Sequence, residues 1–238
     1  NSKSKTINIQ TSGAGETILY NKILDIQNNY ISRIKFSFLP RYSGVTIRIT
    51  SLENDIELLS VVKKEVISRL GKYYFATNNT TLAEFILKEL KRKKLTLGIA
   101  ESCTGGFISK LITDCSGSSE VYKGTIISYS NETKEQSLNI PHKMISKYGA
   151  VSKEVSELMC KNISEILKVD ISISCTGISG PLGGTKEKPV GLVFISVNYK
   201  DLIFTKKFIF FKDREIHREI TANTALNMLR LALLDKLD

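Results

Sequence analysis

Residues 95–100 (LTLGIA) form a nearly unbroken apolar run, which constrains the fold more than any other feature of the sequence. A strand that is apolar on both faces must be covered on both, as the inner strands of a parallel sheet are. From residue 80 onward, strand-like and helical patterns alternate, which is typical of an α/β sheet with helices on both faces. The sequence therefore predicts a three-layer α/β/α domain over residues 80–238.

Capping signals and apolar periodicity mark the elements of this domain. Thr81 and Glu84 form a capping box that starts a helix over residues 82–94. Ser152 is a typical N-cap for a following amphipathic helix, and Asp213 begins the last helix. Further strands are predicted at 124–129, 171–177, 191–197 and 204–211.

The first 79 residues show a different order of elements. A helix is predicted over 17–29, strands over 31–39 and 45–50, and a second helix over 55–70, with Gly71 after its end. Residues 73–77 (YYFAT) are a candidate third strand. We predict a small α+β module over residues 1–79, which ends in the polar stretch 78–80.

Charge and composition exclude several classes of protein. The formal net charge is +10, but the Lys residues are spread along the whole chain. The densest run, residues 91–94, closes a helix, where cations are favourable, so a nucleic-acid partner is not expected. No apolar run reaches the roughly 18–20 residues of a membrane span, and the polar amino terminus has no secretory signal.

The four cysteines lack CxxC spacing, which predicts reduced thiols in a cytoplasmic protein. The two histidines, His142 and His217, stand in unremarkable contexts. We therefore expect no metal site and no cofactor.

Three loops rich in Gly, Ser and Thr are the candidate sites of chemistry. The first, ESCTGG (101–106), joins a buried strand to a helix, where main-chain N–H groups can bind an anion. A tight strand–helix turn would need the same glycines. The second is GSS (117–119), and the third is the long loop 175–191, whose main-chain donors could hold a phosphate, a ribose or an oxyanion.

A serine acts as a nucleophile only where a base removes its proton. With no histidine suitably placed, a partly buried lysine of lowered pKa is the available base, and Lys134 in YSNETK is the candidate. Cys103, placed before a helix, is a rival nucleophile, although a buried inert thiol is the expected state. Arg214, at the start of the last helix, is a candidate phosphate ligand.

Together these segments carry a family resemblance. AESCTGG, GSS, YSNETK, YGAVS (148–152) and TGISGPLGGTKEKPVG occur in the order seen in the CinA carboxy-terminal domain, the nicotinamide-nucleotide amidase (PncC) family. The resemblance covers about residues 80–238. More loosely, residues 16–79 resemble the KH-like middle domain of longer CinA proteins, but they lack the GxxG loop that clamps nucleic acid.

The resemblance implies an enzyme, often dimeric, that hydrolyses nicotinamide mononucleotide to nicotinate mononucleotide and ammonia. It implies Ser119 as nucleophile, Lys134 as base and Tyr129 beside them, with Ser118 and Ser102 as alternative nucleophiles. The expected substrate-binding residues come from the two glycine-rich loops and the last helix: Ser102, Thr104, Gly105, Gly106, Gly180, Gly183, Gly184 and Arg214.

Two other functions stay open at this point. One is a catalytically degenerate protein that binds the nucleotide without turning it over. The other is a competence- or DNA-damage-associated protein, suggested by the charge and by the name of the family. The molybdopterin-binding-like domain that begins the long CinA proteins is absent from this sequence, so its activity is not expected of this chain.

Overall fold

The structure is a computed structural model that describes residues 5–200 and 202–237. The chain divides into two compact units, Asn1–Phe85 and Ile86–Asp238, which are described separately. The predicted boundary after residue 79 lies just before helix α4 (Leu82–Lys93), whereas the division into units runs within this helix.

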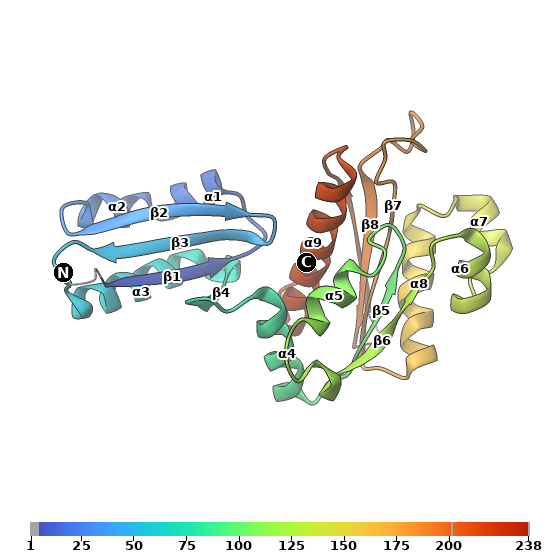
Figure 1. The fold of residues 1–238 in the computed structure, drawn as a ribbon, viewed down its shortest axis with the longest axis horizontal. Helices are drawn as coiled ribbons and strands as arrows, with labels where there is room; N and C mark the ends of the chain where they lie inside the picture. The colour runs from blue at the N-terminus through green and yellow to red at the C-terminus, as the bar shows by residue number, and fades with distance from the viewer. Residues whose placement is uncertain (1–4, 201, 238) are drawn as a thin grey trace. The chain divides into compact units, whose positions relative to one another are not determined.

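The first unit is a four-stranded antiparallel sheet with helices packed on one face (Figure 1). The strand order is β2-β3-β1-β4. The elements are β1 (Thr6–Thr11), α1 (Glu16–Lys22), α2 (Leu24–Tyr30), β2 (Ile34–Arg41), β3 (Gly44–Ser51), α3 (Ile56–Leu70), the short 3₁₀ helix η1 (Gly71–Tyr73) and β4 (Tyr74–Thr77).

Two features of this unit differ from the sequence prediction. Strand β1 was not predicted, although it pairs with both β3 and β4, because its isoleucines Ile7 and Ile9 stand in an otherwise polar run. The helix predicted over 17–29 is two helices. Ile23 leaves helical geometry between them (φ −122°, ψ 14°), and its side chain is fully buried in the core.

The second unit is a three-layer α/β/α domain, as predicted (Figure 1). Helices α6 (Asn131–Leu138), α7 (His142–Tyr148) and α8 (Lys153–Leu167) lie on one side of the sheet, and α5 (Phe107–Thr113) and α9 (Arg214–Leu233) on the other. The strand order is β6-β5-β7-β8-β9. The strands are β5 (Leu97–Glu101), β6 (Tyr122–Ile127), β7 (Ile171–Gly177), β8 (Leu192–Tyr199) and β9 (Leu202–Ile209).

Strand direction determines which loops meet. Strand β5 is parallel to both β6 and β7, so the segments that follow these three strands emerge at the same edge of the sheet. Strand β7 has the predicted bounds, but β6 ends at Ile127, so Tyr129 lies in the segment after the strand. Among the described residues, no helix is long and apolar enough to cross a membrane.

Helix α8 packs on the sheet through buried hydroxyl groups. The Ser156 hydroxyl lies 3.2 Å from that of Ser174 on β7 and 2.7 Å from that of Ser196 on β8. The chain continues from Ser196 to Thr205 on β9 (2.9 Å), whose hydroxyl donates to the Glu157 carboxylate (3.0 Å). Small polar side chains therefore let the helix approach the strands closely, and the hydroxyl groups of Ser156, Ser174, Ser196 and Thr205 all have partners.

We expect Ser156→Val to destabilise the second unit more than Ser156→Ala. Alanine removes hydrogen bonds worth about 1 kcal/mol net. Valine also forces a branched side chain between closely packed layers, which typically costs about 1–3 kcal/mol more. Chemical denaturation followed by circular dichroism would measure the difference. Equal denaturation midpoints for the two variants would show that the space between α8 and the sheet can accommodate a valine side chain.

Candidate functional site

A buried lysine contacts a serine at the edge of the sheet where the parallel strands end. Lys134 Nζ lies 3.0 Å from Ser102 Oγ and donates to the carbonyl oxygen of Ser128 at 2.7 Å. Ser102 follows β5, and Lys134 belongs to α6, which follows β6. Both side chains are buried, Lys134 at 2% and Ser102 at 7% relative exposure.

Burial favours the neutral form of this lysine. Desolvation lowers the pKa of Lys134, and the nearby Cys103 and Cys175 oppose this shift to a smaller extent. A lowered pKa increases the fraction of neutral amine near neutral pH. Only a neutral amine has a lone pair that can accept a proton from Ser102.

The structure does not bring Ser119 and Lys134 together, so the pair predicted from the sequence is replaced by Ser102 and Lys134. Ser119 is exposed and lies in the short 3₁₀ helix η2 (Ser118–Glu120), which precedes β6, whereas Lys134 packs against the segment after this strand. A strand of six residues spans roughly 20 Å, which separates the two ends. Ser118 lies in the same turn as Ser119, so Ser102 is the one of the three candidate serines that contacts the lysine.

The segment after Ser102 is organised by a buried acid. The Glu101 carboxylate is fully buried and accepts hydrogen bonds from Gly106 N (2.9 Å), Ile108 N (3.1 Å) and Ser109 N (2.9 Å). Thr104 Oγ1 adds a fourth donor at 2.7 Å. Because the free N–H groups at the start of a helix favour a negative charge, Glu101 stabilises the start of α5 from within the chain.

This arrangement corrects the prediction that the ESCTGG loop offers its donors to a substrate anion. The hydroxyl of Thr104 and the N–H of Gly106 are bound to Glu101, and the N–H of Gly105 donates to the Ser102 carbonyl at 3.1 Å. The glycines serve the turn itself, since Gly106 has a φ of 92°, which glycine adopts without strain. Within this loop, Ser102 is the residue whose side chain meets Lys134.

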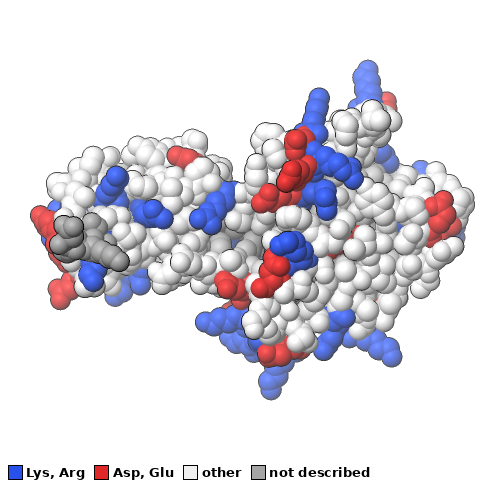
Figure 2. Space-filling view, viewed as in Figure 1, with Lys and Arg blue, Asp and Glu red and all other residues white. Residues whose placement is uncertain are grey.

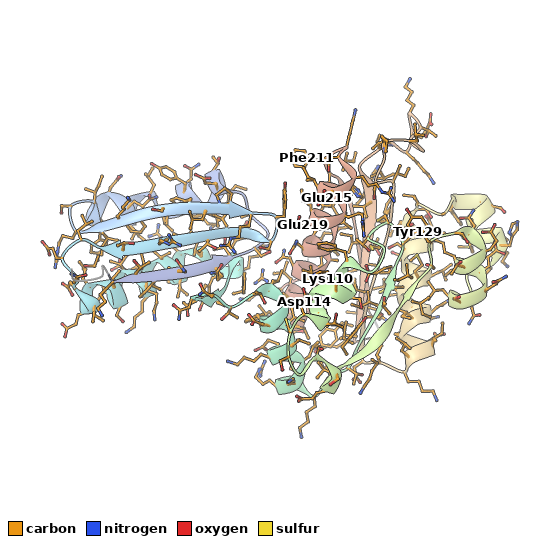
Figure 3. All side chains as sticks on the ribbon, viewed as in Figure 1. Lys110, Asp114, Tyr129, Phe211, Glu215 and Glu219 are labelled. Atoms are coloured by element: carbon orange, nitrogen blue, oxygen red, sulfur yellow. The ribbon has the colours of Figure 1, made fainter. Side chains whose placement is uncertain are left out.

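Arg214 joins Tyr129 to the long loop after β7. Its Nη1 donates to the Gly180 carbonyl at 3.1 Å, and its Nη2 donates to the Tyr129 hydroxyl. Tyr129 follows Ser128, the residue whose carbonyl binds Lys134, and it is 59% exposed. Figure 3 labels its side chain in the segment after β6. The structure thus brings Arg214, Tyr129 and Gly180 together, and Tyr129 is the residue after Ser128, whose carbonyl binds Lys134.

The glycines of the long loop have a packing role. A Cβ at Gly184 would lie 2.7 Å from Val190 N, and a Cβ at Gly180 would overlap the Val190 side chain. The loop folds back on itself here, and a hollow of about 400 Å³ opens beside it. Its lining includes Gly184 but not Gly180 or Gly183; it consists of Pro181, Gly184, Thr185, Pro189, Val190 and Lys212.

The geometry does not support Cys103 as the nucleophile. Cys103 is buried, and its hydrogen bond with Cys175, together with desolvation, raises its pKa well above the ordinary value. A thiol of raised pKa is a poor nucleophile near neutral pH. Among the residues that the structure describes, no group of three or more His, Cys, Asp or Glu side chains could hold a metal ion.

Sequence reasoning missed three residues that shape the site. Glu101 is the last residue of a buried strand and lies shortly before a helix. A charged residue in such a buried position needs hydrogen-bond partners, and this could have indicated its role. Arg218 donates two hydrogen bonds to the Thr104 carbonyl (3.1 and 2.9 Å), and His217 binds the long loop. Both follow Arg214 at helical spacing of three or four residues, and this spacing could have indicated a shared face.

On the face of the described residues that Figure 2 shows, basic side chains form no continuous stripe. On the face shown in Figure 2, Lys and Arg occur in separate groups with acidic residues among them. In the run of residues 91–94, Lys91 pairs with Glu120 and Arg92 with Glu89, both at 2.7 Å. This distribution agrees with a helix end that is partly neutralised.

The fold and the site together define a class of protein: a three-layer α/β domain with a buried serine–lysine pair at the carboxyl edge of its parallel strands. Residues 79–233 match the family model described as the CinA C-terminal domain. The chain belongs to the CinA family.

Individual relatives agree with this assignment. A CinA-like protein of Prochlorococcus marinus (strain MIT 9515) is 43% identical over 98% of the chain, and one of Thermosipho melanesiensis is 41% identical over 94%. The chain spans only about half of these relatives, 54% and 55% of their lengths. The chain is also similar to the crystal structure of competence/damage inducible protein CihA from Agrobacterium tumefaciens, with a TM-score of 0.62 and 32% identity. The match includes 64% of this chain and 93% of that one.

We expect Glu101→Gln to lower the free energy of unfolding. The amide that replaces one carboxylate oxygen cannot accept, so at least one buried N–H at the start of α5 loses its partner, at a cost of about 1–3 kcal/mol. The control is Glu120→Gln, which removes an exposed ion pair worth at most about 1 kcal/mol. Urea denaturation would compare them, and an equal loss in both variants would contradict the role given to Glu101.

Proposed function

We propose that the second unit is an amidohydrolase that converts nicotinamide mononucleotide to nicotinate mononucleotide and ammonia. The observation that supports it is the 3.0 Å contact between Ser102 Oγ and Lys134 Nζ in a buried site. A serine with a neutral lysine as its base is a known solution for cleaving an amide bond without histidine or metal.

The hydrogen bonds of Lys134 suit this role. The Ser128 carbonyl can only accept, so it takes one N–H of the lysine. In the neutral amine the lone pair is then free to accept the Ser102 proton. The buried site strengthens the interaction, because water does not compete for either group.

The reaction proceeds in two halves. Lys134 takes the hydroxyl proton as Ser102 Oγ attacks the carboxamide carbon. The developing oxyanion needs main-chain N–H donors, each worth roughly 3–4 kcal/mol, and the long loop 175–191 is the candidate source of them. Protonated Lys134 returns the proton to the leaving nitrogen, and ammonia departs. A water molecule, deprotonated by Lys134, then attacks the acyl carbon of the acyl-enzyme. The bond to Ser102 Oγ breaks, the protonated lysine returns its proton to this oxygen, and nicotinate mononucleotide is released.

Arg214 and Tyr129 are the proposed contacts of the nucleotide phosphate. Arg214 uses one N–H for Gly180 and one for Tyr129, and a guanidinium has five donors, so three N–H groups remain for phosphate oxygens. The exposed side chain of Tyr129 is accessible to a ligand that approaches from solvent. A phosphate held by Tyr129 contacts the residue that follows Ser128, and the Ser128 carbonyl binds the lysine.

Ser102→Ala and Lys134→Ala should each abolish ammonia release from nicotinamide mononucleotide, with a loss of kcat of at least about 10³-fold. The matched control is Ser119→Ala, which changes an exposed serine at the other end of β6 and should keep wild-type activity. Activity that survives in Ser102→Ala but disappears in Ser119→Ala would overturn the proposed pair. Nucleotide binding without turnover in the wild type would indicate a degenerate enzyme.

The pH profile tests the base. Since burial lowers the pKa of Lys134, kcat/KM should rise with pH and reach its plateau through an apparent pKa below the ordinary lysine value of about 10.4. The sign follows from the mechanism, because the neutral form, which dominates above the pKa, is the active one. Lys134→Arg, which stays charged, should be inactive at every pH. A profile that falls over the same range would contradict a lysine base.

A further inference from the structure

His217 is a buried histidine whose two ring nitrogens both have partners. Its Nε2 lies 3.2 Å from the Gly191 carbonyl, and its Nδ1 lies 2.9 Å from Ser179 Oγ. A carbonyl can only accept, so Nε2 carries a proton. Desolvation lowers the pKa of His217, which favours the neutral ring, and in this tautomer Nδ1 accepts the hydroxyl proton of Ser179.

These two bonds tie both ends of the long loop to the last helix. Ser179 lies at the start of the loop and Gly191 at its end, and His217 lies in the first turn of α9. Ser179 is itself buried, at 5% relative exposure. We call this set the Ser179–His217–Gly191 bridge.

The bridge stands next to the proposed phosphate contacts. Ser179 immediately precedes Gly180, whose carbonyl accepts from Arg214, and Arg214 in turn donates to Tyr129. Arg214 also lies one helical turn before His217 on α9. The Gly180 carbonyl therefore has two neighbours: Ser179, which is bonded to His217, precedes it in the sequence, and the guanidinium of Arg214 donates to it.

We propose that Ser179 and His217 are positioning residues that fix the Gly180 carbonyl and, through it, orient the guanidinium of Arg214 toward the phosphate of the substrate. This role rests on the proposed function, since it concerns the same site. It predicts an effect on the binding of a phosphorylated substrate and little effect on the chemistry at Ser102.

Two substitutions at position 217 separate the two ends of the bridge. In His217→Asn the amide oxygen takes the place of Nδ1 and can still accept from Ser179, but the side chain is too short for Gly191. In His217→Gln the amide nitrogen takes the place of Nε2 and can still donate to Gly191, but the Ser179 bond is lost. Ser179→Ala removes that same bond from the other side, and His142→Asn, which changes an exposed histidine, is the control.

We expect His217→Gln and Ser179→Ala each to raise KM for nicotinamide mononucleotide about tenfold, the size of one lost hydrogen bond, while kcat changes less than about threefold. His217→Asn should stay near the wild-type KM. For nicotinamide riboside, which lacks the phosphate, the KM of all variants should equal that of wild type. Ser179→Ala added to His217→Gln should have no further effect, because the bond is already lost.

Several outcomes would overturn the proposal. They are an equal rise of KM for both substrates, a loss of kcat instead of a rise in KM, or a His217→Asn variant as impaired as His217→Gln. Each of these results would mean that the bridge only stabilises the fold of the loop. Melting temperatures of the same variants would measure that effect.

A second measurement does not depend on the reaction. The ring signals of Tyr129, assigned with Tyr129→Phe in ¹³C-tyrosine-labelled protein, report its contact with Arg214. They should shift in His217→Gln and Ser179→Ala and stay in place in His217→Asn. If wild type releases no ammonia, the proposed function fails, and this pattern of shifts still decides whether the bridge orients Arg214; unchanged signals in all variants would refute it.

Discussion

The buried carboxylate of Glu101 accepts four hydrogen bonds from residues within eight positions of it in the sequence, and the turn that carries Ser102 follows from them. An isolated carboxylate in a protein interior is strongly unfavourable. Here the N–H groups that every helix leaves free at its start supply the compensation, so the charge and the helix end satisfy each other. The main chain of Ser102 is held between this turn and the sheet, which limits where its hydroxyl can lie.

The surroundings of Lys134 do not compensate a charge as those of Glu101 do. Its amine is buried beside a hydroxyl and a carbonyl, neither of which carries a negative charge that would keep it protonated. Glu101 is the last residue of β5, and Lys134 lies in the helix that follows the adjacent parallel strand β6. The carboxylate of Glu101 holds the start of α5, whereas the lysine lies where burial disfavours a charge. A site of this kind separates the group that maintains the geometry from the group that exchanges protons.

The sequence was sufficient to predict the three-layer domain and the order of its strands along the chain, because these depend on apolar periodicity. It also marked Lys134 as the candidate base through the motif YSNETK, and that role stays a prediction. The sequence did not indicate which of Ser102, Ser118 and Ser119 contacts the lysine, because all three lie in similar hydroxyl-rich turns. What separates them is topology: Ser102 follows a parallel strand, as Lys134 does, whereas Ser119 precedes one. The internal anion at α5 was missed for a related reason, because a loop that suits a bound phosphate also suits a carboxylate from its own chain.

Helix α9 supplies three of the contacts that complete the site, and they reach far back along the chain: Arg214 to Gly180 and Tyr129, and Arg218 to Thr104, 114 residues away. During synthesis, Ser102 and Lys134 emerge from the ribosome long before this helix does. The nascent chain therefore carries the nucleophile and its base without the arginines that anchor their surroundings. An incompletely translated chain would therefore lack the arginines that we assign to the phosphate and to the turn after Ser102.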